Sequence, residues 1–124
     1  MLVECLLHSA SRHAGKPAVS DPLRRLTYGQ LLTLARTLRR VVLAETRRDA
    51  VGVLLPASAA GLGSLFGVLW AGRKIVPLNF LLQPRELQAV AADAGIDLVL
   101  SVTHFRTLLS QVPVRTLYLD ELGL

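Results

Sequence analysis

Residues 50–79 read AVGVLLPASAAGLGSLFGVLWAGRKIVPLN, and this stretch decides the fold. Its first part, 50–72, carries no charged side chain. The β-branched run 51–55, which stops at Pro56, predicts a strand buried on both faces. The apolar segment 74–78 predicts a second strand. Two buried strands with a helix between them are typical of a parallel sheet core.

The segment 58–71 between these strands predicts a helix. Ser58 is a suitable N-cap residue, and Gly72 fits the C′ position, where the backbone turns left-handed. Nearly every face of this helix is apolar or small, so we expect it to be buried on more than one side.

The chain on either side of this stretch alternates between helix and strand signals. Thr27 and Gln30 form a capping-box pattern, Pro84 suits the first position of a helix, and Gly95 suits the end of one. Thr103 is predicted to cap a short helix. The remaining predicted elements are a helix at 2–13, a hairpin of strands 18–20 and 24–26, helices at about 27–45, 84–94 and 103–109, and strands at 97–101 and 114–119.

This order predicts an α/β fold of three layers, with a mostly parallel sheet in Rossmann-like or flavodoxin-like order, helices on both faces and a small β-hairpin near the N-terminus. The arginines at 36, 39 and 40 are expected on a solvated helix face. The residues predicted to face inward are Leu2, Cys5 and Leu6 in the first helix, Leu31, Leu34, Ala35, Leu38, Val41 and Val42 in the second, and Leu87, Val90, Ala91 and Ala94 in the helix at 84–94.

The composition indicates a large apolar surface. Hydrophobic residues make up 52% of the 124 positions, and mean hydropathy is +0.46. Either part of the chain enters a membrane or the chain belongs to a larger protein that covers the surplus. The uncharged run 50–72 is long enough to span a bilayer, but Pro56 and several glycines inside it favour a buried strand and helix. We therefore expect no membrane span.

The net charge of +5 raises the question of nucleic acid. Aromatic residues are only 5% of the chain and are scattered, so we expect no nucleic-acid binding. The N-terminus lacks the basic and apolar regions of a secretory signal, which predicts a cytoplasmic protein. Cys5 is the single cysteine, so an intrachain disulfide is excluded and no Cys/His metal cluster is predicted.

Two motifs resemble functional sites. Gly61, Gly63 and Gly67 approximate a dinucleotide fingerprint, but they fall inside the predicted helix instead of the turn before it, so close helix packing is the favoured interpretation. Cys5, His8 and Ser9 share a helix without any orienting group, which favours a buried structural thiol. The strand ends also lack the carboxylate cluster of a phosphate-receiving signalling domain.

Several short segments occur in an order and spacing that identify a family. They are KPAV at 16–19, RLTYGQL at 25–31, VGVLLPAS at 51–58, GVLWAG at 67–72, VPLN at 76–79, PREL at 84–87 and DAG at 93–95. Over residues 2 to about 105 the chain resembles the N-terminal region of the AMP-forming adenylating enzymes, which include acyl-CoA and acyl-carrier-protein synthetases, luciferases and peptide-synthetase adenylation domains. The segment NFLL at 79–82 is most similar to the fatty-acyl branch.

The resemblance implies a ligase. Such enzymes use ATP and Mg²⁺ to convert a carboxylic acid, here a fatty acid, into an acyl-adenylate, and then transfer the acyl group to coenzyme A or a carrier protein. It also implies that residues 1–124 form a single domain, the first α/β subdomain of a larger enzyme, with the remainder of that enzyme as partner.

The family's phosphate loop, its ribose-binding aspartate and its catalytic lysine have no counterpart in these residues. Lys74 begins a strand and does not end a glycine-rich loop. We therefore predict no catalytic, cofactor-binding or metal-binding residue in the chain, which would be inactive alone. Its uncovered apolar surface predicts self-association. The alternative hypothesis is a stand-alone α/β module for binding or protein interaction.

Overall fold

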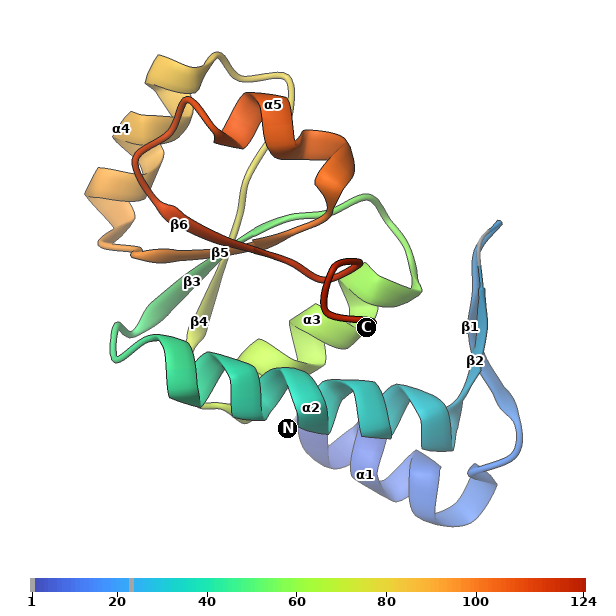
Figure 1. Cartoon of the computed structure of the whole chain (residues 1–124). Helices are drawn as coiled ribbons and strands as arrows, with labels where there is room; N and C mark the ends of the chain where they lie inside the picture. Colours follow the sequence, from blue (N-terminus) through green and yellow to red (C-terminus); the bar gives the residue numbers. More distant parts are fainter. Residues whose placement is uncertain (1, 23) are drawn as a thin grey trace.

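The computed structural model describes residues 2–22 and 24–124 and shows an α/β fold of three layers (Figure 1). The helices are α1 (Leu2–His13), α2 (Tyr28–Glu45), α3 (Ala59–Trp70), α4 (Pro84–Ala94), the short 3-10 turn Thr103–Phe105 and α5 (Arg106–Leu109). The strands are β1 (Pro17–Ser20), β2 (Arg25–Thr27), β3 (Ala50–Leu54), β4 (Lys74–Pro77), β5 (Leu98–Ser101) and β6 (Arg115–Tyr118). The predicted succession of elements is confirmed.

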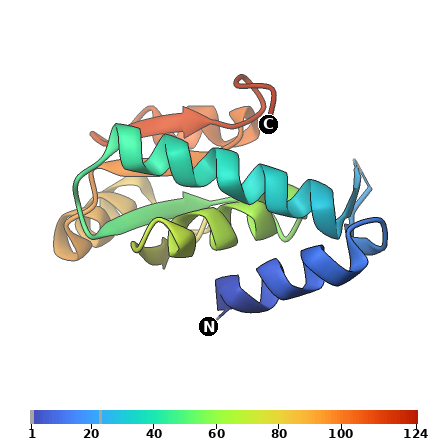
Figure 2. The same cartoon turned by 90° about the horizontal axis from the view of Figure 1, so that it is seen from below.

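The central sheet is parallel throughout, in the order β4-β3-β5-β6. Counted along the chain, its second strand lies outside its first, and the third and fourth follow on the other side, which is the flavodoxin-like order. The strands β1 and β2 form a separate antiparallel hairpin. It projects from the same end of the molecule as the start of α2 (Figure 2). The predicted fold class is therefore confirmed.

Helices cover both faces of the sheet and enclose two apolar clusters. The larger cluster joins α1, α2 and α3 to one face of the sheet, and the smaller joins α4 and α5 to the other. The strand β5 is buried along its whole length, as the continuous apolar run 98–100 predicts. In the described residues, the length and apolarity needed to cross a bilayer are not found together in any helix.

The helix α3 packs closely on α2 through its glycines. A Cβ atom at Gly63 would lie 2.5 Å from Cδ2 of Leu34, and one at Gly67 would lie 2.6 Å from Cβ of Leu38. The helix also contacts α1 and the strands β3 and β4. Burial on several sides is what its uniformly apolar sequence predicts.

Predicted capping signals are largely confirmed. The side chains of Thr27 and Gln30 form the expected capping box at α2, and Ser58 caps α3. Gly72 and Gly95 take left-handed backbone angles, with φ of 76° and 68°, where the helices before them end. These angles suit glycine because it has no Cβ atom.

Some predicted inward faces are wrong. In α1, Leu6 and Ala10 form the buried stripe, one turn apart, which leaves Leu2 and Cys5 exposed. In α4, Leu87 and Ala91 are buried as predicted, Val90 is half-buried, and Ala94 in the last turn is exposed. In α2, the predicted stripe is buried except for Val41, which is half-buried.

Of the α2 arginines predicted to lie on a solvated face, Arg36 and Arg40 are exposed as predicted, and Arg39 is half-buried. The guanidinium carbons of Arg36 and Arg39 lie 5.9 and 5.6 Å from the centre of the Trp70 ring, at the end of α3. The Nε of Arg39 also donates a hydrogen bond of 3.4 Å to the carbonyl of Trp70. These two side chains therefore pack over an aromatic ring between helices, which the sequence prediction missed.

Candidate functional site

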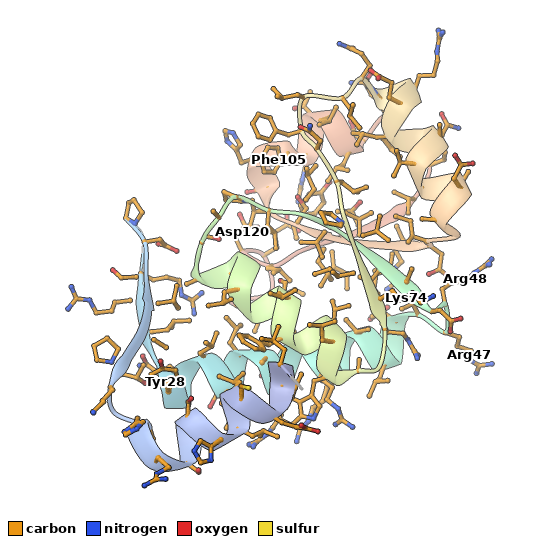
Figure 3. All side chains as sticks on the ribbon, turned by 180° about the vertical axis from the view of Figure 1, so that it is seen from behind. Tyr28, Arg47, Arg48, Lys74, Phe105 and Asp120 are labelled. Carbon is orange, nitrogen blue, oxygen red and sulfur yellow. The ribbon has the colours of Figure 1, made fainter. Side chains whose placement is uncertain are left out.

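The carboxyl ends of the four parallel strands meet at one edge of the sheet. The chain passes from β3 outward to β4 and then returns across β3 to β5, so the strand order reverses between β3 and β5. Ligands of open α/β sheets bind outside the carboxyl ends of the strands at such a point. Phe105 and Asp120 lie toward this edge, whereas Arg47, Arg48 and Lys74 lie at the opposite, amino edge (Figure 3).

Where the strand order reverses, the ends of β3 and β5 are joined by a hydrogen bond. The hydroxyl of Ser101, at the end of β5, donates to the carbonyl oxygen of Leu54, at the end of β3, over 2.6 Å. Ser101 is fully buried. Its hydroxyl ties the two strands together and is not presented to a ligand.

A second polar pair joins the ends of β5 and β6. The backbone N–H of Thr103 donates to the carboxylate of Asp120 over 3.1 Å, and the hydroxyl of Thr103 donates to the same carboxylate. The hydrogen bond from the Thr103 hydroxyl lowers the pKa of Asp120, and the backbone N–H of Thr103 acts in the same direction. Thr103 therefore secures the loop after β5. The prediction that it caps a helix is wrong, because its side chain is turned toward Asp120.

The start of α3 faces this edge and already holds a carboxylate. Oδ2 of Asp21 accepts a hydrogen bond of 2.7 Å from the N–H of Ala59, and the hydroxyl oxygen of Ser58 accepts one of 3.1 Å from the N–H of Gly61. Oδ1 of Asp21 accepts from the N–H of Arg24. A helix N-terminus attracts anions, and Asp21 provides the anion from within the chain.

These contacts argue against a phosphate cradle at α3. Gly61, Gly63 and Gly67 all lie inside the helix, as predicted, and the last two contact α2. An anionic ligand would have to displace Asp21 to reach the N–H of Ala59. The start of α3 is therefore occupied by a carboxylate of the chain itself.

The rest of the edge, near β4, is apolar. An open hollow of about 390 Å³ lies between β3, β4 and the start of α3, and Ser58 supplies the single polar side chain among its lining residues. In the segment after β4, the ring of Phe80 lies 5.8 Å from the ring of Phe105. Phe80 and Leu81 are 58% and 74% exposed, so an apolar surface extends outward from the edge.

The other candidate groups do not assemble into a site. Cys5 is exposed, so the predicted burial of its thiol is wrong. Among the residues that the structure describes, no three His, Cys, Asp or Glu side chains are placed to hold a metal ion. The predicted absence of catalytic residues remains a prediction.

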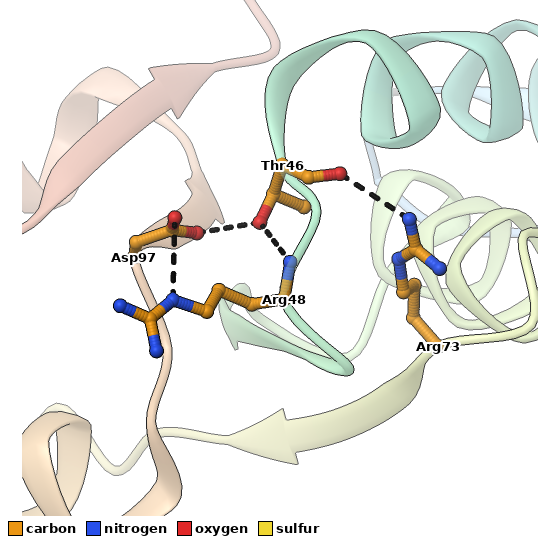
Figure 4. Close-up of polar contacts among 4 residues, drawn as sticks. All are labelled: Thr46, Arg48, Arg73 and Asp97. Carbon is orange, nitrogen blue, oxygen red and sulfur yellow. Dashed lines mark hydrogen bonds and ion pairs between the residues drawn. The ribbon is translucent and has the colours of Figure 1, made fainter.

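A polar cluster at the amino edge has a structural role (Figure 4). The buried hydroxyl of Thr46 donates to Asp97 over 2.5 Å and accepts from the N–H of Arg48 over 3.0 Å. Nη2 of Arg73 donates to the carbonyl of Thr46 over 3.3 Å. The cluster connects the loop after α2 with the starts of β4 and β5, and sequence reasoning missed it because its members lie far apart in the chain.

Comparison with known proteins agrees with this architecture. The family model described as AMP-binding enzyme matches residues 6–122. The chain is 30% identical over 118 residues to the long-chain-fatty-acid–CoA ligase of Salmonella typhimurium, covering 93% of this chain and 21% of that protein. It is 32% identical over 115 residues to phosphinothricin tripeptide synthetase PhsC of Streptomyces viridochromogenes, covering 91% and 11%.

Solved structures show the same fold. The anthranilate CoA ligase AuaEII, in complex with anthranoyl-AMP, superposes with a TM-score of 0.82 at 25% identity, covering 94% of this chain and 25% of that one. The N-terminal domain of FACL13 from Mycobacterium tuberculosis superposes with a TM-score of 0.88 at 22% identity, covering 98% and 34%. The chain spans about a fifth of the length of the fatty-acid–CoA ligases that it matches, in their N-terminal part. With a family match over nearly all of its residues, this chain belongs to the AMP-binding enzyme family.

Proposed function

We propose that this chain is the first α/β subdomain of an ATP-dependent, AMP-forming ligase that activates a fatty acid. The whole enzyme would join the carboxylate to AMP with release of pyrophosphate, and then transfer the acyl group to a thiol, either coenzyme A or a carrier protein. ATP and Mg²⁺ would be bound by other parts of that enzyme. The proposal rests on the family match together with the similarity to long-chain-fatty-acid–CoA ligases.

Within that enzyme we infer a scaffolding role for the present residues. The observation that carries this inference is the internal use of the polar groups at the carboxyl edge. Ser101 bonds to Leu54, Asp120 to Thr103, and Asp21 to the start of α3. If they turned to a ligand, Ser101 would leave a buried carbonyl without a donor and Asp21 would leave the start of α3 without its carboxylate, while Asp120 would lose its hydrogen bonds from Thr103.

The apolar part of the edge suits contact with the remainder of the enzyme. The exposed side chains of Phe80 and Leu81 follow shortly after Leu78, which lines the hollow between β3, β4 and α3. Covering them with another part of the same protein would remove apolar area from water, at roughly 25 cal/mol per Å² buried. A fatty-acid ligase of the relatives' length supplies that covering.

The experiment is to read the gene past the codon for Leu124 and to assay its complete product. We expect the same reading frame to continue into a glycine-rich loop that ends in lysine, and the product to catalyse fatty-acid-dependent exchange of pyrophosphate into ATP. A stop codon directly after Leu124 would favour the stand-alone interaction module. A continuous product that binds ATP but activates only amino acids would retain the ligase class and refute the fatty-acid substrate.

A further inference from the structure

The two outer strands of the sheet differ in how well their free edges are protected. The edge strand β4 begins with the exposed Lys74 and ends with Pro77, and both residues discourage pairing with another strand. The edge strand β6 contains no proline. Its single charge, Arg115, is already paired with Glu45 of α2. The edge of β6 is therefore open to pairing.

The direction of the backbone groups in β6 follows from one hydrogen bond. The N–H of Leu119 donates to the carbonyl of Ser101, 2.9 Å away in β5. Backbone groups alternate in direction along a strand, so those of Arg115 and Leu117 also face β5. Those of Val114, Thr116 and Tyr118 face away from the sheet.

The fold uses some of these outward groups and leaves others free. The carbonyl of Tyr118 accepts from the N–H of Glu121 over 3.0 Å, and the N–H of Val114 donates to the carbonyl of Val112 over 2.8 Å. Within the described residues, no partner is found for the N–H and carbonyl of Thr116, the N–H of Tyr118 or the carbonyl of Val114. The hydroxyl of Thr116 is buried and likewise has no partner.

We propose that a second copy of this chain pairs with the β6 edge, antiparallel, about a two-fold axis at Thr116. In this register each Thr116 exchanges N–H···O bonds with Thr116 of the second copy. The N–H of each Tyr118 donates to the carbonyl of Val114 of the second copy. The free outward groups are then all used, and neither of the two groups that the fold has already satisfied is required.

The side chains agree with this register. Val114 comes opposite Tyr118 of the second copy, a β-branched and aromatic pair of the kind that stabilises antiparallel strands. Thr116 comes opposite Thr116, a pair of β-branched side chains that suits neighbouring antiparallel strands. Arg115 comes opposite Leu117 and keeps its contact with Glu45. The two central sheets become one continuous sheet across the axis.

The test follows single amides in the wild-type chain as protein concentration rises. We expect light scattering to show a mass that rises from 13.4 kDa toward twice that value. Hydrogen exchange at the N–H groups of Thr116 and Tyr118 should slow by at least about tenfold over the same range, while exchange at Leu117, which already faces β5, should not change. This outcome does not depend on the ligase function.

Two results would overturn the proposal. The first is a monomer at every concentration up to the millimolar range. The second is association without added protection at Thr116 and Tyr118, which would move the contact elsewhere, such as to Phe80 and Leu81.

A pair of matched variants separates the edge from general charge effects. Thr116→Lys places a charge at the centre of the edge, and we expect it to raise the dimer dissociation constant by at least about tenfold. Thr107→Lys adds the same charge on the exposed face of α5 and should leave it unchanged. Equal weakening by both variants would contradict the proposed site. Circular dichroism establishes that each variant is folded, and if Thr116→Lys is not, the wild-type exchange measurement decides.

Discussion

The carboxylate of Asp21, in the turn of the N-terminal hairpin, accepts a hydrogen bond of 2.7 Å from the backbone N–H of Ala59, at the start of α3. The two residues are 38 positions apart in the chain. This contact fixes the hairpin to the carboxyl edge of the sheet. It also occupies the helix terminus at which an anionic ligand would otherwise bind.

Replacing Asp21 should therefore destabilise the fold. Loss of a capping carboxylate costs about 0.5–2 kcal/mol, so we expect Asp21→Ala to lower the free energy of unfolding in urea by about 1–2 kcal/mol. Asp21→Asn should lose less, because the amide oxygen still accepts a hydrogen bond. Asp93→Ala, at an exposed site in α4, serves as the control and should change stability by no more than about 0.5 kcal/mol. Equal effects at the two positions would contradict the capping role.

The close contact of α2 with α3 predicts a ranked series of glycine variants. A Cβ at Gly67 would meet Cβ of Leu38 at 2.6 Å and the carbonyl oxygen of Ala35 at 3.0 Å, neither of which moves without the backbone. We expect Gly67→Ala to destabilise by about 1–3 kcal/mol. Gly63→Ala meets the flexible end of Leu34 and should cost less.

The control for this series is Gly15→Ala. No atom lies within 4 Å of a Cβ built at Gly15, and its φ is not positive, so the substitution should be neutral or slightly stabilising. Thermal unfolding measured by circular dichroism gives the ranking. If Gly67→Ala were as stable as wild type, close packing would not explain the glycines of α3.

The Thr103–Asp120 pair predicts a pH-dependent effect. The hydrogen bond from the Thr103 hydroxyl holds the pKa of Asp120 below the ordinary value of 3.8. A carboxyl whose pKa is lower in the folded state stabilises the fold above the unfolded pKa, and this contribution is lost as the pH falls through the folded pKa. Thr103→Val should therefore raise the pKa of Asp120, measured by carboxyl ¹³C NMR titration.

The stability difference between wild type and Thr103→Val should be present at pH 7. It should shrink below the ordinary carboxyl pKa of 3.8, as the pH falls through the lowered pKa of Asp120. Thr107→Val, on the exposed surface of α5, is the matched control and should leave the Asp120 titration unchanged. An unchanged titration in Thr103→Val would show that the backbone N–H alone sets the pKa of Asp120.

The amino-edge cluster allows a buried hydrogen bond to be compared with a surface ion pair. Asp97→Ala removes the acceptor of the buried Thr46 hydroxyl and should cost about 1–3 kcal/mol. Arg48→Ala removes only an ion pair of 3.8 Å between side chains that are at least half exposed, so it should cost no more than about 1 kcal/mol. Urea unfolding of both variants measures the difference. A larger loss in Arg48→Ala would show that the ion pair, not the hydroxyl contact, holds the cluster.

The features that could be predicted from the sequence are those that depend on residues close together in the chain. The capping box at Thr27 and the left-handed glycines at 72 and 95 are local patterns, and the uncharged run 50–72 becomes a buried strand and helix because its character is uniform. The parallel sheet follows from alternation of helix and strand with short connections.

Contacts between distant residues could not be predicted in this way. Threonine is a suitable helix-capping residue, which is why Thr103 was predicted to cap a helix. Because β5 and β6 are neighbours in the sheet, its hydroxyl instead donates to Asp120, which is 17 positions later in the chain. From the sequence, Asp21 was predicted only to lie in a turn. Its hydrogen bond to Ala59 could not be predicted, because the fold brings together two residues that are 38 positions apart. Cys5 looked inward by periodicity, but the contact of α1 runs through Leu6 and Ala10.

We propose that these residues form a structural subdomain of an adenylating enzyme and contain none of its catalytic residues. The most direct measurement is exchange of labelled pyrophosphate into ATP by the purified 124-residue chain, with Mg²⁺ and a panel of fatty acids, and with a complete long-chain-fatty-acid–CoA ligase as positive control. We predict no exchange above the rate without protein for any fatty acid. Exchange that depends on both the chain and a fatty acid would contradict the claim.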